Sequence, residues 1–343
     1  MTRRFLVTGA SGFIGRNLVE ALVNEYPQDE FHLLYREDKF LDGIEQFISR
    51  FEGVNIHTHK CDIRNEGDLD DVIREAQPNL TIHMAAITPV RYSWERPKEY
   101  MEVNYFGTIN LLQSLSKLSL ITRKKHFIIF YSTPEVLGHQ RSYSNYLFTQ
   151  FTEMDHAYPT SPYAASKLAA ESYVRYQKNV PGCIVRPANT FDRTIIGKNE
   201  EARGYFVEKA IIQLLTKGQA EFDGNPHVLR TWIHVSDHVG ALMQIVREYV
   251  TSSPMYFPLP IYHLAPLDER ALASCQQVVD MVAKIIGLDH PKIEWGKNVR
   301  PWDPHVLIIK GEGYNYRYKY PWKDLYSGLR MAVMNWKRVL GIA

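Results

Sequence analysis

Short apolar runs alternate with helical patterns through the first half of the chain. Phe5-Leu6-Val7 precedes a glycine-rich turn, after which Ile14, Leu18 and Leu22 recur at helical spacing. Further β-like runs lie at residues 31–35, 54–57, 81–84, 126–131 and 182–186, with helix-like segments between most of them. Such alternation is typical of a parallel sheet covered by helices on both faces. We therefore expect an α/β fold with a doubly wound parallel sheet.

The pattern changes after about residue 187. Prolines and aromatic residues crowd residues 253–266 and 295–322, so we expect irregular structure there. A strand-like run at 230–235 and a helix-like run at 239–248 interrupt this region. We predict a Rossmann-type first domain over residues 1–187, to which residues 228–250 return, and a smaller, irregular C-terminal domain over most of residues 188–343.

Composition and charge bear on the partners, the metal content and the location of the protein. The 343 residues have a formal net charge of +2 and no dense Lys/Arg block beyond residues 123–125, so we expect neither nucleic acid nor a membrane as partner. Cys61, Cys183 and Cys275 lack metal-ligand spacing, which predicts free thiols and no metal site. Without a signal peptide or a long apolar span, the chain is expected to be cytoplasmic.

The glycine-rich turn has the spacing Gly-x-x-Gly-x-x-Gly, formed by Gly9, Gly12 and Gly15 between a predicted strand and a predicted helix. Glycine lets the backbone approach a pyrophosphate closely, and the helix N-terminus offers N–H groups to it. The first gap is one residue wider than in the usual dinucleotide fingerprint. We predict that the turn binds a nicotinamide dinucleotide, with Ser11, Phe13 and Ile14 completing the site; the alternative is a plain turn or helix C-cap.

The residue after the second predicted strand indicates which dinucleotide is bound. An acidic residue there binds a ribose hydroxyl, whereas an arginine accommodates a 2′-phosphate. This chain has Arg36, followed by Glu37 and Asp38. The sequence favours NADP; the alternative is NAD, with Arg36 on the surface and Glu37 or Asp38 binding the ribose.

Tyr163 and Lys167 lie four residues apart in a predicted helix that Ser161 would cap, with Pro162 at its first position. An ordinary tyrosine titrates at about pH 10, roughly three units too high for a base at neutral pH. A lysine cation and an oxidised nicotinamide would both favour the phenolate. Tyr163 could then accept a proton from a sugar hydroxyl as a hydride leaves. A purely structural role is the alternative.

At these residues the chain resembles the extended short-chain dehydrogenase/reductase family, the NAD(P)-dependent nucleotide-sugar epimerases and dehydratases. The resemblance covers nearly the whole chain and includes Cys61-Asp62-Ile63, His83-Met84-Ala85-Ala86, Val103-Asn104-Tyr105-Phe106-Gly107-Thr108, Tyr131-Ser132-Thr133, Arg186-Pro187-Ala188-Asn189 and Arg230-Thr231-Trp232-Ile233-His234-Val235-Ser236-Asp237. It implies cofactor contacts from Asp62, Ile63, Ala85, Ala86 and Pro187, in addition to those above. It also implies a nucleotide-diphosphate sugar as substrate.

The same resemblance gives the second domain a substrate-binding role. Asn189, Arg230 and Arg300 would contact the substrate diphosphate. The alternatives are that Arg230 is a surface ion-pair partner and that Asn104 only ties a helix to a loop. Relatives pair through a four-helix interface, so we expect a homodimer formed by residues 100–115 and 163–176. These helices could instead simply pack on their own sheet.

Residues 132–138 bear on the reaction. In this family Thr133 would hydrogen-bond the reacting sugar oxygen, and Glu135 matches the glutamate of 4,6-dehydratases and UDP-glucuronate decarboxylases. A carboxylate there can remove the C5 proton once C4 is a ketone. Pro134 departs from the dehydratase pattern because it supplies no proton, and Val90-Arg91-Tyr92-Ser93 is reminiscent of uronate 4-epimerases.

These signals leave several reactions open. We expect an NDP-hexose 4,6-dehydratase similar to GDP-mannose 4,6-dehydratases, with Thr133, Glu135, Tyr163 and Lys167 as catalytic residues. A 4-epimerase acting on a uronate or hexose, or a UDP-glucuronate decarboxylase, is the alternative. A regulatory protein that binds dinucleotide without turnover is a further alternative. Such a protein needs none of the proton chemistry of Thr133, Tyr163 and Lys167, so the presence of all three argues against it.

Overall fold

The computed structural model describes residues 2–37, 43–138, 150–192, 205–296 and 306–342. The chain divides into two compact units. The first unit comprises Met1–Val136, Ser161–Arg186 and Val239–Tyr262, and the second comprises Leu137–Thr160, Pro187–His238 and His263–Ala343. This division assigns residues 239–250 to the first unit but residues 228–238 to the second. The functional assignment of the two predicted domains stays a prediction.

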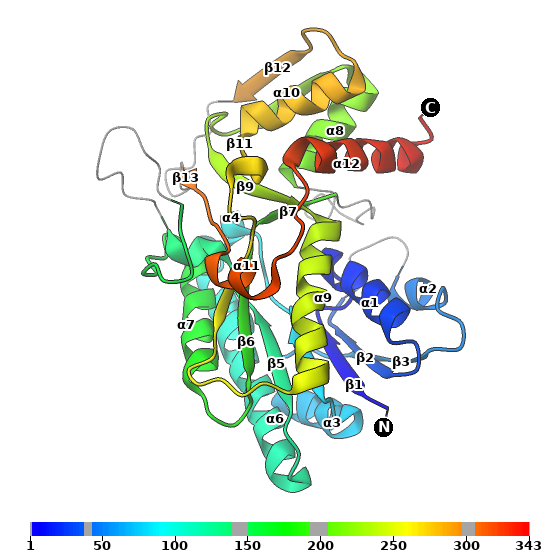
Figure 1. Ribbon diagram of the computed structural model, residues 1–343, viewed down its shortest axis with the longest axis vertical. Helices are drawn as coiled ribbons and strands as arrows, with labels where there is room; N and C mark the ends of the chain where they lie inside the picture. The colour runs from blue at the N-terminus through cyan, green and yellow to red at the C-terminus, as the bar shows by residue number, and fades with distance from the viewer. Residues whose placement is uncertain (1, 38–42, 139–149, 193–204, 297–305, 343) are drawn as a thin grey trace. The chain divides into compact units, whose positions relative to one another are not determined.

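A seven-stranded sheet forms the centre of the first unit (Figure 1). Its strand order is β10-β6-β5-β4-β1-β2-β3. The strands are β1 (Arg4–Thr8), β2 (Glu30–Tyr35), β3 (Asn55–Lys60), β4 (Leu80–His83), β5 (Phe127–Tyr131), β6 (Gly182–Pro187) and β10 (Ile261–Leu264). The six strands from β6 through β5, β4, β1 and β2 to β3 run parallel to their neighbours in this order. The predicted Rossmann-type α/β fold is therefore confirmed.

Strand β10 corrects the expectation of irregular structure over residues 253–266. Its four residues are buried, and the neighbouring Pro260 carbonyl accepts a hydrogen bond from Ile184 N of β6 at 2.9 Å. Prolines close to so short an apolar run obscure its strand character, because proline normally disrupts strand ladders. Only the edge position beside β6 makes the segment a strand.

Helices cover the sheet of the first unit. They are α1 (Phe13–Glu25), α2 (Ile44–Ile48), α3 (Glu66–Ala76), α4 (Val90–Ser93), α5 (Pro97–Met101), α6 (Gly107–Thr122), α7 (Pro162–Tyr176) and α9 (Val235–Ser252). Helices α3, α6 and α7 contribute Leu69, Leu111, Leu115 and Val174 to one apolar core with Ile128 of β5. Helices α1 and α9 lie side by side, where the Arg247 guanidinium pairs with Glu25 at 2.6 Å (Figure 1).

The predicted helix over residues 100–115 is interrupted. A π-helical turn, η1 (Glu102–Phe106), joins α5 to α6. Such turns inside helices occur frequently at functional sites. The turn contains the buried Asn104, whose contacts are described below.

The second unit has its own sheets and core. Strand β9 (Leu229–His234) pairs with β11 (Leu272–Ser274), β13 (Val306–Leu307) and β7 (Asn189–Phe191), and β8 (Gln219–Asp223) pairs with β12 (Lys292–Gly296). Helices α8 (Phe206–Lys217), α10 (Cys275–Ile286), α11 (Glu312–Tyr318) and α12 (Leu325–Leu340) accompany them. Trp232, Val279 and Leu329 belong to its buried core.

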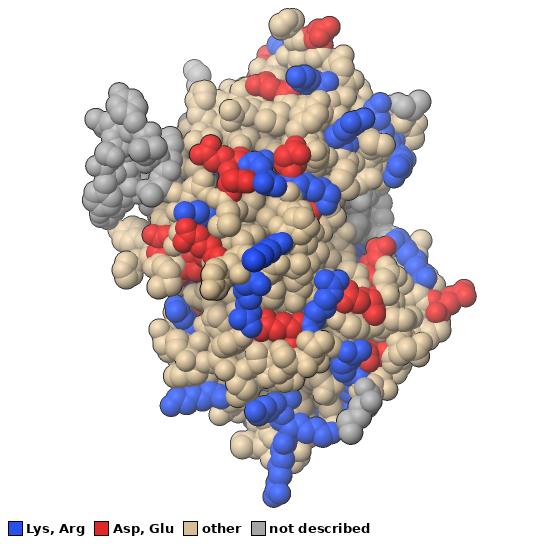
Figure 2. All heavy atoms as spheres, viewed as in Figure 1, with Lys and Arg blue, Asp and Glu red and all other residues tan. Residues whose placement is uncertain are grey.

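Charged side chains of both signs are scattered over the molecular face in Figure 2, between larger areas of other residues. Acidic and basic groups are interspersed over most of that face, whereas basic groups predominate at its lower end. Residues 123–125, the basic run of the sequence, are exposed. Within the described residues, no helix is both long enough and apolar enough to cross a membrane.

Candidate active site

The glycine turn after β1 is closely packed, and two of its glycines are required sterically. Gly9 has φ +72°, and a Cβ there would lie 2.9 Å from Ala85 N in the loop after β4. A Cβ on Gly15 would lie 2.4 Å from the Gly9 carbonyl oxygen. Both distances are shorter than real Cβ contacts, so side chains at Gly9 and Gly15 would force the turn apart.

The start of helix α1 suits an anion. Gly12 is its N-cap and provides no side-chain hydrogen bond, and no acidic residue lies in the first turn. The first N–H groups of a helix lack intrahelical partners and carry partial positive charge. A dinucleotide pyrophosphate therefore fits this turn, with the backbone from Ser11 to Gly15, including Phe13 and Ile14, as its cradle. The Ser11 hydroxyl donates to the Glu37 carbonyl oxygen at 3.0 Å.

Two charged residues follow strands β2 and β3. Arg36 comes directly after β2, and its Nε lies 3.1 Å from Glu37 Oε1. Asp62 follows β3 and accepts from the Arg64 guanidinium at 2.6 Å, which holds the pKa of Asp62 below its ordinary value. The positive charge of Arg36 lowers the same pKa. Ile63 is buried next to Asp62.

Helix α7 presents Tyr163 and Lys167 as its sequence predicts. Ser161 caps the helix by accepting from Ala164 N at 3.1 Å, and Pro162 occupies the first turn. Tyr163 is 7% exposed, and its ring meets the Tyr100 ring edge to face. Lys167 is 3% exposed, with its Nζ 4.4 Å from the centre of the Phe130 ring in β5. The lysine therefore contacts the strand that leads to Thr133.

Burial controls the charge of Lys167. Desolvation lowers its pKa from 10.5 to about 7, and the Glu171 carboxylate opposes that shift. Glu171 itself is paired with Arg186, whose Nε donates to Glu171 Oε2 at 3.0 Å, and both side chains are nearly fully buried. Sequence reasoning missed this pair. No local signal points to Arg186, because it lies in β6; the four-residue spacing indicates only that Glu171 shares a helical face with Lys167.

The segment after β5 contains the predicted reaction-specific residues. Thr133 is buried, and its Oγ1 accepts from Glu135 N at 3.3 Å, which leaves the hydroxyl proton for another acceptor. Pro134 starts a short 3-10 helix, η2 (Pro134–Leu137), in which Glu135 is half-buried. The buried Ser132 Oγ has no hydrogen-bond partner among the described residues, so a polar ligand atom could satisfy it.

Asn104 connects the loop after β4 to helix α7. Its Oδ1 accepts from Ile87 N at 2.9 Å, and its Nδ2 donates to the Ile87 carbonyl at 3.1 Å and to Ser166 Oγ at 3.0 Å. Ile87 follows Ala85 and Ala86, whereas Ser166 lies next to Lys167 in α7. With these contacts Asn104 ties a helix to a loop, as one of the two interpretations of this residue expected.

His83 provides a second buried connection, which sequence reasoning missed. Its Nδ1 lies 2.7 Å from Thr8 Oγ1, and its Nε2 lies 3.0 Å from Thr108 Oγ1. Burial lowers the pKa of His83 to about 3, so the imidazole is neutral. Because Thr108 donates to the Asn104 carbonyl, His83 must donate from Nε2 and accept at Nδ1. Ala85 N donates to Thr8 Oγ1 at 3.1 Å, so this network also holds the loop after β4.

In the second unit, Asn189 and Arg230 lie on neighbouring strands. Asn189 of β7 donates from Nδ2 to the Thr231 carbonyl of β9 at 3.3 Å. Arg230 is 6% exposed, so the alternative that Arg230 is a surface ion-pair partner is wrong. Pro187 ends β6, and Arg300 and Asp38 lie outside the described residues.

Comparison with known proteins decides the family. The family model described as GDP-mannose 4,6 dehydratase matches residues 6–267, which include the glycine turn, Thr133, Glu135, Tyr163 and Lys167. The chain belongs to this family. The predicted extended short-chain dehydrogenase/reductase character is thereby confirmed, and with it a nicotinamide-dependent enzyme of nucleotide-sugar chemistry.

Individual relatives of this dehydratase family agree. A dTDP-glucose 4,6-dehydratase from Mycobacterium tuberculosis is 28% identical over 73% of this chain and 72% of its own length. The dTDP-glucose 4,6-dehydratase DesIV from Streptomyces venezuelae, solved with NAD bound, has a TM-score of 0.77 at 23% identity, covering 98% of this chain and 97% of its own. A UDP-glucose 4-epimerase from Thermotoga maritima has a TM-score of 0.79 at 20% identity, covering 98% and 99%. The two structural likenesses support the fold alone.

Proposed function

We propose that this enzyme is an NDP-hexose 4,6-dehydratase that removes water from C5 and C6 of the sugar by way of a transient ketone at C4. The observation that supports this most is that Thr133 and Glu135 lie together in the segment after β5, where the backbone N–H of Glu135 donates to Thr133 Oγ1 at 3.3 Å. The same unit contains Tyr163 and Lys167. Elimination at C5 requires a carboxylate near the hydroxyl that binds the C4 oxygen, and we assign that role to Glu135.

The first proposed step oxidises C4. The nicotinamide cofactor, when bound at the glycine turn, supplies a hydride acceptor and later a hydride donor. Thr133 donates its hydroxyl proton to the sugar oxygen and orients it, since its oxygen already accepts from Glu135 N. Tyr163 then removes the C4 hydroxyl proton. Lys167, which burial holds near its titration point, supplies positive charge beside the phenolate.

The second proposed step eliminates water. A C4 ketone makes the C5 proton acidic, and Glu135 removes it as the C6 hydroxyl departs. Pro134 has no proton to give, so Glu135 returns the proton that it has taken to the leaving hydroxyl. The carboxylate ends this step ionised, and one water molecule is lost. Return of the hydride to C6 and addition of a proton to C5, which Glu135 takes up from solvent and delivers, complete the reaction. Tyr163 releases to solvent the proton that it took from the C4 hydroxyl.

Pro134 also leaves two alternative reactions, because an enzyme with no proton donor at position 134 could proceed from the C4 ketone without eliminating water. Return of the hydride to the opposite face of C4 would make the enzyme a 4-epimerase. With a uronate as substrate, loss of carbon dioxide would make it a UDP-glucuronate decarboxylase. The substrate diphosphate, in either case, is assigned to Asn189 and Arg230, with Arg300 as a further candidate.

Incubation with a panel of NDP-hexoses and NDP-uronic acids, followed by mass spectrometry, tests the proposal. Loss of one water from an NDP-hexose is expected. Unchanged mass with altered retention would replace the proposal with epimerisation, and loss of carbon dioxide would replace it with decarboxylation. Tyr163→Phe should abolish turnover without weakening cofactor binding. Glu135→Gln should still reduce the cofactor transiently but release no water-loss product, whereas the exposed control Glu95→Gln should behave as wild type.

We propose NADP as the cofactor, with NAD as the alternative. Arg36 directly follows β2, and its side chain is 34% exposed, which suits an arginine that pairs with a 2′-phosphate. Its contact with Glu37 would have to open for that pairing. Equilibrium titrations should show tighter binding of NADP than of NAD, and Arg36→Ala should remove the difference. Tighter binding of NAD by the wild type would contradict this assignment.

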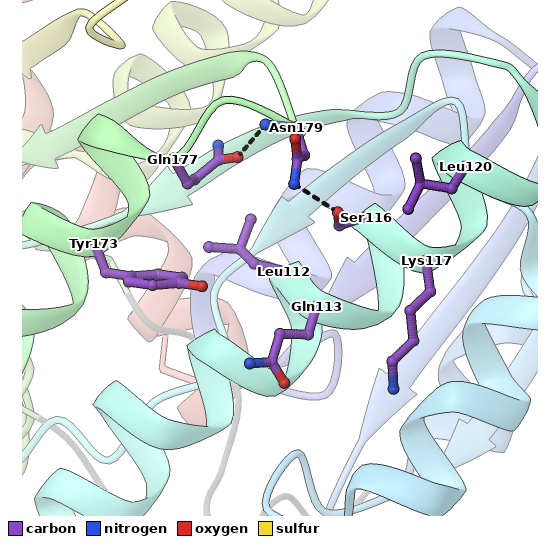
Figure 3. A pocket seen from close by; sticks show the side chains of 8 residues that line it. All are labelled: Leu112, Gln113, Ser116, Lys117, Leu120, Tyr173, Gln177 and Asn179. Atoms are coloured by element: carbon purple, nitrogen blue, oxygen red, sulfur yellow. Dashed lines mark hydrogen bonds between the residues drawn. The ribbon is translucent and has the colours of Figure 1, made fainter.

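We also propose a homodimer formed through α6 and α7. Figure 3 shows a shallow hollow between these helices, lined by Leu112, Gln113, Ser116, Lys117, Leu120, Tyr173, Gln177 and Asn179. At its rim Leu120 is 78% exposed, next to Ile121 at 80%. Exposed apolar side chains beside a groove are typical of a protein interface. Light scattering should give a dimer mass, and Leu120→Glu should give a monomer; a monomeric wild type would contradict the proposal.

We propose a cytoplasmic location because of the state of the cysteines. Cys61, Cys183 and Cys275 form no disulfide bond within the described residues, which is typical of a reducing compartment. Fractionation of the source cells with an antibody would test it, and recovery from a secreted fraction would contradict it.

A further inference from the structure

A cluster of imidazoles and one carboxylate lies on strands β2 and β3, at the edge of the first unit's sheet. Glu30 and His32 are two residues apart in β2, so they share one face of the sheet. His57 of β3 is directly opposite His32 in the parallel register, and His59 follows two residues later on the same face. Sequence reasoning did not find this cluster because its members come from separate strands.

The spacing of the three ligand atoms suits one small cation. His32 Nε2 lies 2.9 Å from Glu30 Oε1, and His57 Nε2 lies 3.5 Å from the same oxygen. All three atoms lie within 4.8 Å of one another. Ligands about 2.0–2.1 Å from a tetrahedral zinc ion lie about 3.3 Å from each other. The two measured separations bracket this value. The His32 and His57 rings are stacked, with centroids 4.8 Å apart and 13° between their planes, so one ring would have to rotate for both nitrogens to face one ion.

Burial and accessibility also favour a ligand. His57 Nε2 is buried and makes no hydrogen bond within the described part of the chain, which leaves a polar atom unsatisfied. The His57 side chain as a whole is 41% exposed, so an ion could reach the site from solvent, whereas His32 is 1% exposed. Neutral imidazole is the metal-binding form of histidine.

Two further residues orient the three ligands. His59 Nε2 lies 2.9 Å from His32 Nδ1, so His32 can donate its second ring proton while Nε2 binds a metal. Arg4 Nε lies 3.1 Å from Glu30 Oε2 and leaves Oε1 facing the imidazoles. Outer hydrogen bonds of this kind are typical of metal-ligating histidine and carboxylate groups. The positive charge of Arg4 opposes a cation, so we expect reversible rather than permanent binding.

We propose that Glu30, His32 and His57 form a binding site for a divalent transition-metal ion of the zinc class, with His59 as the orienting residue. Two imidazoles and one carboxylate are a ligand set of zinc sites, and three protein ligands leave a coordination position open. The site ties β2 to the edge strand β3. It is independent of the proposed dehydratase reaction, which uses none of these residues.

Cobalt and zinc titrations of tag-free, chelator-treated full-length protein at pH 8 test the site. Wild type should bind one Co²⁺ per chain with the intense visible bands of tetrahedral cobalt, and Zn²⁺ should displace it. His57→Gln should weaken Co²⁺ binding by more than about 100-fold, and His59→Gln by about 10- to 100-fold, as expected for a ligand and for its outer partner. The control His227→Gln removes an exposed histidine of the second unit and should bind as wild type does.

Other outcomes of these titrations would refute the proposed metal site. Absence of cobalt bands in the wild type would do so, as would equal affinity in wild type and His57→Gln. Glu30→Gln provides a second variant in case His57→Gln is poorly folded, which circular dichroism and binding of the nicotinamide cofactor would reveal. Loss of cobalt binding in His227→Gln alone would assign the ion to another part of the chain and refute the proposal.

Discussion

Replacing Lys167 by methionine should remove turnover and yet stabilise the cofactor-free protein at low pH. The ammonium group is buried, and burial lowers its pKa from 10.5 to about 7. The unfolded chain keeps this proton up to about pH 10.5, whereas the folded chain releases it near pH 7. Between these values the unfolded state binds more protons, so the free energy of unfolding of the wild type rises with pH. Methionine has no charge to bury and lacks this dependence.

The magnitude follows from the same shift. At about 1.36 kcal/mol per pKa unit, the burial of the charged lysine costs about 5 kcal/mol at pH 6. Lys167→Met should therefore be more stable than wild type by about 5 kcal/mol at pH 6. Near pH 9 the folded lysine is neutral, and its remaining penalty relative to the charged lysine of the unfolded chain is about 2 kcal/mol. The advantage of Lys167→Met should therefore fall to about 2 kcal/mol at pH 9.

Urea unfolding of the cofactor-free proteins at pH 6, 7.5 and 9, followed by circular dichroism, measures the difference. Lys125→Met, at an exposed position, is the matched control and should show no such trend. A Lys167→Met variant that is less stable than wild type at pH 6 would refute the reasoning. So would a difference that stays constant between pH 6 and pH 9. Turnover should fall by at least about 100-fold, the lower range for loss of acid–base assistance.

Two further substitutions test the packing around the site. Glu171→Gln should lower the free energy of unfolding by about 3–5 kcal/mol, because the buried Arg186 charge loses its carboxylate partner. Urea unfolding should show the Glu171→Gln/Arg186→Met double variant to be more stable than the Glu171→Gln single variant. The reverse order would contradict this explanation. Gly15→Ala places a Cβ 2.4 Å from the Gly9 carbonyl oxygen and should cost about 1–3 kcal/mol and weaken cofactor binding, measured by calorimetry. Gly67→Ala, whose Cβ would meet nothing closer than 3.7 Å, should change neither, and equal losses in both variants would rule out the steric explanation.

Much of the first unit could be predicted because its signals are local. Each apolar run in the first half corresponds to a parallel strand, with bounds that differ by a few residues. Ser161 and Pro162 start α7 by rules that involve only neighbouring residues, and Gly9 adopts the positive φ that glycine permits. The candidate residues Tyr163 and Lys167 follow from four-residue spacing, which any helix places on one face.

Contacts between distant parts of the chain were beyond such rules. Strand β10 exists because β6 offers it an edge, not because its four residues form a clear strand pattern. The partner of Glu171 lies in a strand fifteen residues away, Asn104 contacts Ser166 across 62 residues, and Glu30 meets His57 only through strand register. Apolar periodicity and capping act within a few residues and are therefore visible in the sequence, whereas a buried charge, a hydrogen-bonded amide or a metal-binding cluster acquires its partner only when packing brings separate segments together.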